Sequence, residues 1–288
     1  MKEDSKKNIG TLYIVGTPIG NLGDITLRAI ETLKMVDIIL AEDTRQTLKL
    51  LNHLKITKHQ ISYHRHNEEQ KISQVLDILN DGKNIALVSD AGMPRISDPG
   101  EALIKYLIEN EYKVEVVPGV TALATAVAMC GYDADRFTFE GFLPMNNVRR
   151  KERLEELKKE TRLMVFYEAP HKILYTLKDM YKYFGDRKIC IARELTKLHE
   201  ESIHCTILDA IENIENSGIK GEIVLLVCGA DKNSIVAASD ENTNLSNTEL
   251  VNKYINEGMS KKDAIKKVAK ERKLDKNTVY MECVNNGD

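Results

Sequence analysis

The segment that decides the fold reads Val88-Ser89-Asp90-Ala91-Gly92-Met93-Pro94-Arg95-Ile96-Ser97-Asp98-Pro99-Gly100. It follows a short apolar run, residues 85–88, that is typical of a buried strand, and it leads into a helical pattern. A connection between a strand and a helix usually has about two to six residues, but this one has about ten and is rich in Gly, Pro and Asp. Open α/β sheets bind ligands beyond the carboxyl ends of their strands, and glycine lets a backbone approach a ligand closely. We therefore interpret the segment as one wall of a ligand site, with a plain strand-to-helix connection as the alternative.

Apolar runs rich in Ile and Val alternate with helical periodicity through the first part of the chain. Strands are predicted at residues 12–15, 38–41, 60–64, 85–89 and 113–117. The clearest helix between them covers residues 68–79 and carries its apolar side chains on one face. Repeated β-α-β units imply a mostly parallel sheet that helices cover on both faces.

After Pro118 the pattern changes, and a second sheet is expected. A helix of small residues at 119–130 precedes strands predicted at residues 137–142, 163–167, 188–193, 202–208 and 222–227. The predicted fold class is therefore α/β, with two α/β domains at residues 10–118 and 119–230.

The two ends of the chain differ from these domains. Residues 1–9 are expected to be a disordered N-terminus, and residues 231–244 have the Asp-, Asn- and Ser-rich composition of a linker. Residues 245–288 are predicted to form a small helical module of the helix-turn-helix kind, because Ser246 with Glu249 and Ser260 with Asp263 fit the pattern that starts a helix. From Lys253 to Lys276 there are nine Lys or Arg against four Asp or Glu. A solvated helix face explains this charge, and contact with a phosphate backbone is the alternative.

Composition limits the classes of protein that fit. The chain has 288 residues, 42% of them apolar, and a net charge of −3, which argues against coating nucleic acid by bulk positive charge. Its five cysteines show no C-x-x-C pair, so they indicate neither a disulfide framework nor a zinc knuckle. No apolar run is long enough to cross a bilayer. We expect a cytoplasmic protein with no membrane contact.

The first strand is also followed by a glycine-rich loop, Gly16-Thr17-Pro18-Ile19-Gly20-Asn21-Leu22-Gly23-Asp24. Its glycine spacing does not match the dinucleotide fingerprint, and Pro18 removes an N–H donor that a pyrophosphate would need. Glu42 and Asp43 nevertheless follow the second strand, where a ribose ligand stands in nicotinamide enzymes, so an oxidoreductase stays open as an alternative. A cofactor with a ribose but no pyrophosphate, such as S-adenosylmethionine, agrees better with these departures.

Several long segments together point to one family. They are Gly16 to Thr26, Ala41-Glu42-Asp43-Thr44-Arg45, Tyr63-His64-Arg65-His66-Asn67-Glu68, Asp90 to Gly100, Val117-Pro118-Gly119 and Phe166-Tyr167-Glu168-Ala169-Pro170-His171-Lys172. Their wording and order resemble the tetrapyrrole methylase superfamily, and within it the members that methylate ribosomal RNA. Members that methylate porphyrin-type rings carry a Gly-Gly-Asp-Pro type of sequence where this chain has Ser89-Asp90-Ala91-Gly92-Met93-Pro94.

The resemblance implies 2′-O-methylation of a cytidine ribose in the 16S RNA of the small ribosomal subunit. It implies S-adenosylmethionine as the cofactor, a cofactor cleft between the two α/β domains, and a homodimer. Methylation of a porphyrin or corrin precursor on the same fold is the first alternative. A non-catalytic RNA-binding protein is the second.

The cofactor residues follow from the matching motif positions. By this resemblance the cofactor site comprises Pro18, Asp90, Gly92, Ile96, Thr121, Ala122 and Tyr167. Thr121 is expected in the first turn of the small-residue helix, where free N–H groups would receive the carboxylate of the methionyl group. For Asp90, capping of its own loop is the competing role.

Methyl transfer to a ribose oxygen needs little covalent chemistry from the protein, but a base or a cation near the hydroxyl would help. Candidates for the base are Asp43, Glu168, His171 and Glu194, and those for the cation are Arg45, Lys172, Arg193 and Lys197. Asp43, Arg45 and Glu168 are the predicted catalytic residues. No metal is expected, because His64 and His66 have no convergent third ligand in the sequence.

Contacts with RNA are expected from local groups of polar and basic side chains. The predicted substrate residues are Asn21, His64, Arg149, Arg150, Lys151, Lys262 and Lys266. For the lysines and arginines, a solvated helix face is the alternative.

Overall fold

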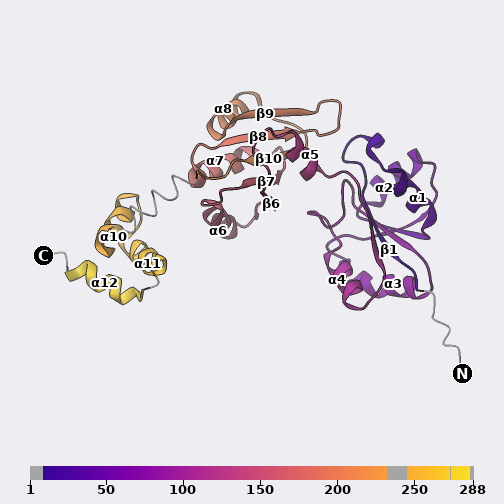
Figure 1. Ribbon diagram of the computed structural model, residues 1–288, viewed down its shortest axis with the longest axis horizontal. Helices are drawn as coiled ribbons and strands as arrows, with labels where there is room; N and C mark the ends of the chain where they lie inside the picture. The colour runs from indigo at the N-terminus through magenta and orange to yellow at the C-terminus, as the bar shows by residue number, and fades with distance from the viewer. Residues whose placement is uncertain (1–8, 232–244, 273, 286–288) are drawn as a thin grey trace, which may run out of the picture. The chain divides into compact units, whose positions relative to one another are not determined.

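The structure is a computed structural model that describes residues 9–231, 245–272 and 274–285. By its internal contacts the chain divides into two compact units, residues 1–229 and residues 230–288. The larger unit contains two five-stranded sheets (Figure 1). The expected N-terminal segment 1–9 and linker 231–244 lie almost wholly outside the described residues.

The first sheet is entirely parallel and has the strand order β3-β2-β4-β1-β5. Its strands are β1 (Leu12–Val15), β2 (Ile38–Ala41), β3 (His59–Ser62), β4 (Ile85–Val88) and β5 (Val114–Val117). The segments between them are η1 (Leu22–Asp24), α1 (Leu27–Met35), α2 (Thr44–His53), α3 (Glu68–Asn80) and α4 (Glu101–Glu109). The parallel sheet that was predicted from the alternation of strands and helices is therefore confirmed.

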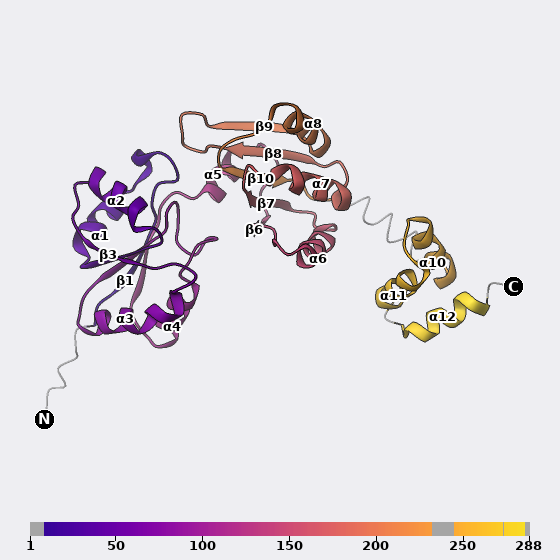
Figure 2. The same ribbon diagram turned by 180° about the vertical axis from the view of Figure 1, so that it is seen from behind.

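Both faces of the first sheet are buried. Leu40, Ile85 and Leu87 pack with α3 and α4, whereas the intervening Ile39 and Ala86 pack with α1 and α2. The two pairs of helices lie on opposite sides of the strands in both views (Figures 1 and 2). Because both faces are covered, the inner strands β1, β2 and β4 read as nearly continuous apolar runs, whereas the edge strands β3 and β5 include polar residues.

The second sheet is mixed and has the order β6-β7-β10-β8-β9. Its strands are β6 (Phe137–Gly141), β7 (Leu163–Glu168), β8 (Lys188–Arg193), β9 (Glu201–Thr206) and β10 (Ile223–Val227). Only β6 and β7 run parallel, and the other neighbours are antiparallel. Its helices are α5 (Ala122–Met129), α6 (Asn147–Leu157), α7 (Ile173–Phe184) and α8 (Ile207–Ser217). Residues from α6, α7 and α8 pack on one face, and residues from α5 pack on the other together with Ile19 of the first glycine-rich loop.

Three predicted boundaries shift by two or more residues, each for a local reason. Strand β3 ends at Ser62 rather than at His64, because His64 and Asn67 form a turn in which the His64 N–H donates to the Asn67 side chain. Helix α5 begins at Ala122 because extended Thr121 caps it. Residues 207 and 208 belong to α8 rather than to β9, because Thr206 and Asp209 form a capping box there.

In its described residues the smaller unit contains three helices, α10 (Asn247–Asn256), α11 (Lys261–Glu271) and α12 (Lys276–Asn285). Ser246 and Glu249 form the complete capping box that the sequence predicted, whereas Ser260 caps α11 with its hydroxyl oxygen alone. The three helices share a core that includes Leu250, Ile265 and Val279. Within the described residues, no helix is long and apolar enough to span a membrane.

Candidate active site

A cavity of about 440 Å³ lies where loops of both sheets meet in the larger unit. Its wall includes the loops after β1, β2 and β4 and the start of α5, and it also includes the ends of β6, β7, β8 and the start of β10. Ligand pockets commonly have volumes of about 300–1,000 Å³. The cavity therefore has the size of a small-molecule site, at the carboxyl edge of the parallel sheet where open α/β folds bind ligands.

The loop of residues 89–100 forms much of this wall and is anchored at three points. Gly92 and Thr17 exchange backbone hydrogen bonds of 3.0 and 2.8 Å, which join the loop to the one after β1. The Arg65 guanidinium donates to the Ser97 carbonyl at 2.5 Å. The Glu68 carboxylate accepts hydrogen bonds from the Gly100 and Ala102 N–H groups. Glu68 therefore caps α4, because the residue at the cap position, Gly100, has no side chain to do so. The anchors hold the loop in a defined shape.

Two loops of the wall present an apolar side chain in the same way. Ile96 lies between Arg95 and Ser97, which have φ values of +73° and +70°. Leu195 lies between Glu194 and Thr196, which have φ values of +51° and +65°. Positive φ costs free energy for residues other than glycine, and such strain concentrates at functional sites. Both apolar residues line the cavity.

The loops after β1 and β5 approach one another closely just before α5 begins. A Cβ atom on Gly16 would lie 2.7 Å from Cα of Gly119, so both positions require glycine for packing. Thr121 caps α5 through its hydroxyl, which accepts from the Ala124 N–H at 3.1 Å. The Tyr167 hydroxyl accepts from the Leu123 N–H at 3.2 Å. The amino end of α5 thus opens on the cavity with the positive end of its dipole.

Three carboxylates of the first sheet's loops belong to the cavity wall. Glu42, Asp90 and Asp98 all line the cavity. Burial raises the pKa of Asp98 to about 6, with a further contribution from the negative charge of Glu42. Burial, followed by the charge of Asp90, also raises the pKa of Glu42. Arg65 is a nearby cation that favours the charged form of both Glu42 and Asp98. A cationic ligand would relieve this repulsion.

Most of the predicted cofactor residues come together here. The residues that line the cavity are Asp90, Gly92, Ile96, Thr121, Ala122 and Tyr167, and Pro18 is not among them. The Asp90 carboxylate also accepts from the Asp43 N–H at 3.0 Å, so it links the ends of β4 and β2, which differs from the capping of its own loop that was the competing prediction.

The three predicted catalytic residues lie in different surroundings. Asp43 caps α2 and forms a 2.7 Å ion pair with exposed Arg45, and neither residue lines the cavity. The Arg45 guanidinium holds the pKa of Asp43 near 2. Glu168 does line the cavity, but it is buried and both of its oxygens are bonded, to the Ala169 N–H and the Thr176 hydroxyl.

The predicted substrate residues divide into exposed and buried ones. Arg149, Lys151, Lys262 and Lys266 are exposed, as is Asn21, whose side-chain oxygen caps η1. Arg150 is instead buried, because its guanidinium binds Asp179 at 2.7 Å and Thr176 at 2.9 Å. His64 is half-buried beside His66, and the described residues contain no group of three ligands that could hold a metal ion.

Sequence reasoning did not single out Asp98, Arg65 or Phe142. Asp98 and Arg65 lie inside the segments that carry the family resemblance, so the signal was present, but only the folded chain shows that Asp98 lines the cavity and that the charge of Arg65 acts on it. Phe142 ends the predicted strand 137–142 and would have been read as a core residue, yet it is 56% exposed.

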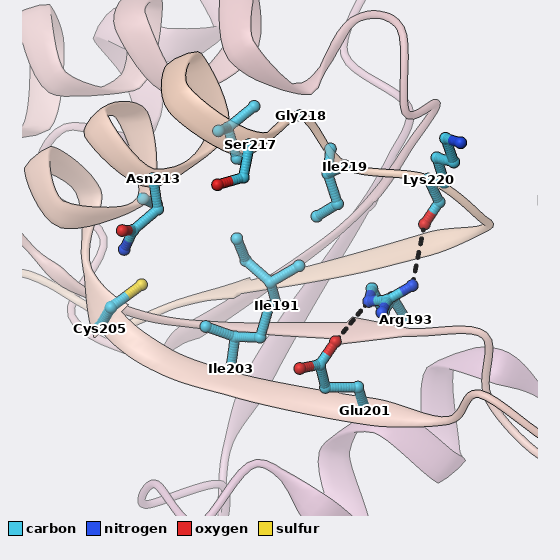
Figure 3. A pocket seen from close by; sticks show the side chains of 12 residues that line it. Ile191, Arg193, Glu201, Ile203, Cys205, Asn213, Ser217, Gly218, Ile219 and Lys220 are labelled. Atoms are coloured by element: carbon cyan, nitrogen blue, oxygen red, sulfur yellow. Dashed lines mark hydrogen bonds and ion pairs between the residues drawn. The ribbon is translucent and has the colours of Figure 1, made fainter.

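A second hollow of similar volume lies over β8 and β9, beside the end of α8 (Figure 3). Ile191, Ile203 and Ile219 line it, and the Arg193 guanidinium at its edge is bound to Glu201 and to the Lys220 carbonyl. Arg193 was one of the candidates for the catalytic cation, but none of the residues predicted to bind the cofactor belongs to this hollow, nor does Asp43, Arg45 or Glu168. The cavity between the loops of the two sheets is therefore the candidate active site.

The sequence profile of the tetrapyrrole (corrin/porphyrin) methylases matches residues 11–211. The chain belongs to this family. Among the curated members of the tetrapyrrole methylase family, a protein of Synechocystis named ribosomal RNA small subunit methyltransferase I is 45% identical, over 94% of this chain and 96% of its own length. A protein of Bacillus subtilis with the same name is 44% identical, over 97% of this chain and 96% of its own length.

Solved structures of the methylase family show the same fold. A uroporphyrin-III C-methyltransferase of Thermus thermophilus, solved in complex with S-adenosyl homocysteine, superposes with a TM-score of 0.56 at 16% identity, over 76% of this chain and 97% of that one. The predicted α/β class with two domains of the tetrapyrrole methylase type is thereby confirmed.

Proposed function

We propose that this protein transfers the methyl group of S-adenosylmethionine to the 2′-oxygen of a cytidine ribose in the 16S RNA of the small ribosomal subunit. The observation that carries the proposal is identity of 44–45% with ribosomal RNA small subunit methyltransferase I over nearly the whole chain. The match covers both domains that form the cavity, and it also covers the C-terminal helices.

The residues of the cavity fit S-adenosylmethionine. The acidic wall of Glu42, Asp90 and Asp98 suits the positive charges of its sulfonium and amino groups. The amino end of α5, capped by Thr121, suits its carboxylate. When bound, the cofactor supplies a methyl group that is already activated on sulfur.

The chain's own residues would then orient the ribose and handle its proton. Orientation alone contributes about 7–11 kcal/mol to well-aligned reactions. The hydroxyl loses its proton as its oxygen takes the methyl group, and the cavity offers carboxylates as acceptors. Asp98 is better suited than Glu168, because both Glu168 oxygens already accept hydrogen bonds. It is also better suited than Asp43, because Arg45 lowers the pKa of Asp43 to about 2, which makes it a weak base, and because Asp43 does not line the cavity. Asp43 with Arg45 then serves to fix the end of β2 through Asp90.

RNA would be held by exposed basic residues rather than by net charge. Arg149 and Lys151 of α6 follow the loop that lines the cavity, and Lys262 and Lys266 are exposed on α11. Arg150 is not part of this surface, because its guanidinium is bound inside the domain. Replacing Lys262 and Lys266 together by alanine should weaken binding of the small subunit and flatten its salt dependence, while affinity for S-adenosylmethionine stays unchanged. We also infer that the enzyme acts in the cytoplasm as a homodimer, which mass determination in solution tests.

Incubation of the protein with labelled S-adenosylmethionine and small ribosomal subunits from a strain that lacks it tests the function. Label at a cytidine ribose of the 16S RNA supports the proposal. Label in a porphyrin or corrin precursor, with none in RNA, supports the small-molecule methylase instead. Binding of the cofactor and of subunits without transfer to either acceptor supports a non-catalytic RNA-binding protein.

A further inference from the structure

An exposed aromatic side chain stands at the edge of the cavity. Phe142 lines the cavity, yet 56% of the residue is exposed. Its ring is the outer member of a row of three: it lies 5.7 Å from the Tyr167 ring, which in turn lies 5.0 Å from the Phe139 ring, both in edge-to-face geometry. Phe139 and Tyr167 are partly buried, so the row runs from the domain interior to solvent.

The residues that follow Phe142 share its exposure. Met145 is 83% exposed and Val148 is 64% exposed, and both precede the basic residues Arg149 and Lys151 on the first turns of α6. A run of exposed apolar side chains beside basic ones does not stabilise the free protein, because the apolar surface remains in water. It matches the composition of surfaces that bind single-stranded nucleic acid, where aromatic faces stack on bases and cations contact phosphates.

We infer that Phe142 is a stacking platform for the base of the target nucleotide, which is drawn out of the RNA so that its ribose reaches the cavity. This inference rests on the proposed function and assigns it a substrate-positioning residue. The ribose 2′-oxygen must enter a cavity that the loops of two sheets enclose, and a nucleotide stacked between its neighbours in a helix presents that oxygen only at the helix surface. Extruding the nucleotide costs a few kcal/mol, which stacking on a new aromatic face offsets.

The alternatives for this surface are a lid on the cofactor and a contact between protomers. Tyr167 already joins the aromatic row to α5 through its bond with the Leu123 N–H, so Phe142 is the member of the row left free to meet a second substrate. Arg149 and Lys151 add positive charge beside it, which suits phosphate, whereas a twofold contact at this surface would bring the same positive charges of two copies together.

Three substitutions at this position separate stacking from apolar contact. Phe142→Tyr keeps the aromatic face, Phe142→Leu keeps apolar area without it, and Phe142→Ala removes both. Each stacked base contributes about 1–3 kcal/mol. We therefore expect Phe142→Leu and Phe142→Ala to lower kcat/KM for small subunits by about 5- to 150-fold, and Phe142→Tyr to lower it by less than about twofold. Affinity for S-adenosylmethionine by calorimetry should stay unchanged in all three. Ile108→Ala, at an exposed apolar position of α4, is the matched control and should leave every value unchanged.

Phe142→Trp provides a direct reading, because the chain contains no tryptophan. Its fluorescence should be quenched by a single-stranded cytidine oligonucleotide and not by S-adenosylmethionine alone. The inference is overturned if Phe142→Leu methylates subunits as well as Phe142→Tyr does, if the substitutions weaken cofactor binding, or if they change the mass of the protein in solution. Absence of RNA methylation by the unmodified protein would instead overturn the proposed function.

Discussion

The carboxylate of Asp90, at the end of β4, accepts a 3.0 Å hydrogen bond from the backbone N–H of Asp43, at the end of β2. Both strands are adjacent in the parallel sheet, and Asp90 lines the cavity. One side chain therefore fixes the edge of the sheet and places a negative charge on the wall of the site.

Substituting Asp90 separates these two roles. Asp90→Asn keeps an acceptor oxygen for the Asp43 N–H but removes the charge, whereas Asp90→Ala removes both. We expect the Asp90→Asn protein to have nearly the stability of the unmodified protein. It should bind S-adenosylmethionine at least about tenfold more weakly, which corresponds to about 1.4 kcal/mol. The Asp90→Ala protein should lose a further ~1 kcal/mol of unfolding free energy. Calorimetry and urea denaturation measure the two effects, and unchanged cofactor affinity in both variants would show that the Asp90 charge plays no part in binding.

The stability of the protein should fall as pH rises through the titration of Asp98. The pKa of this carboxyl is raised from 3.8 to about 6 in the folded state, chiefly by burial and then by Glu42. The folded protein therefore holds a proton that the unfolded chain has lost, and stability decreases between about pH 4 and pH 6. Asp98→Asn should be more stable than the unmodified protein by about 1–2 kcal/mol at pH 7, after allowance for solvent screening, and should show no gain at pH 4. Urea denaturation at both pH values measures this, and an equal gain at both would contradict the assignment.

Affinity for the cofactor should also depend on the protonation of Asp98, but it should rise with pH where the stability of the protein falls. A cationic ligand beside Asp98 favours the carboxylate, so binding releases the proton and affinity for S-adenosylmethionine rises as pH increases from about 5 to 7. In Asp98→Asn this dependence should flatten. Calorimetry in two buffers of different ionisation enthalpy counts the released protons. A flat profile for the unmodified protein would rule out contact between the carboxylate and the ligand's charge.

Gly16→Ala should disrupt the site without touching a charge. The new Cβ atom would meet the Gly119 backbone at 2.7 Å, so the loops after β1 and β5 must separate. We expect a loss of about 1–3 kcal/mol of unfolding free energy and a loss of cofactor affinity. Gly23→Ala is the matched control, since its Cβ would meet only the Asn21 side chain, at 3.2 Å. Equal effects of the two substitutions would show that close approach at Gly16 is not needed.

Neighbouring arginines of α6 should give opposite results. Arg150→Ala removes the guanidinium partner of Asp179 and leaves Thr176 with only its bond to Glu168, and it should destabilise the protein by about 3 kcal/mol. Arg149→Ala and Lys151→Ala should leave stability within about 0.5 kcal/mol and reduce the salt dependence of RNA binding by about one unit of slope each. Thermal denaturation and binding titrations at several salt concentrations measure these effects. If Arg150→Ala lowered RNA affinity without lowering stability, Arg150 would be a residue of the RNA-binding surface.

The sequence by itself determined the sheet architecture and the general position of the site. Continuous apolar strands alternating with amphipathic helices permit only a parallel sheet with both faces covered, and its carboxyl edge is where loops converge. Six of the seven residues predicted to bind the cofactor line the cavity for this reason, because each lies in a loop or cap at that edge or on the facing second sheet.

Only the tertiary structure decided which side chains of those loops are free. Arg149 and Arg150 look alike in sequence, yet the helix turns one to solvent and the other to Asp179, because adjacent residues lie about 100° apart on a helix. Asp98, Glu42 and Arg65 come from three separate loops, and the effects of Glu42 and Arg65 on the pKa of Asp98 depend on distances that no local pattern encodes. The exposure of Phe142 likewise depends on the absence of a covering element within the described residues, which is a property of packing and not of the strand that it ends.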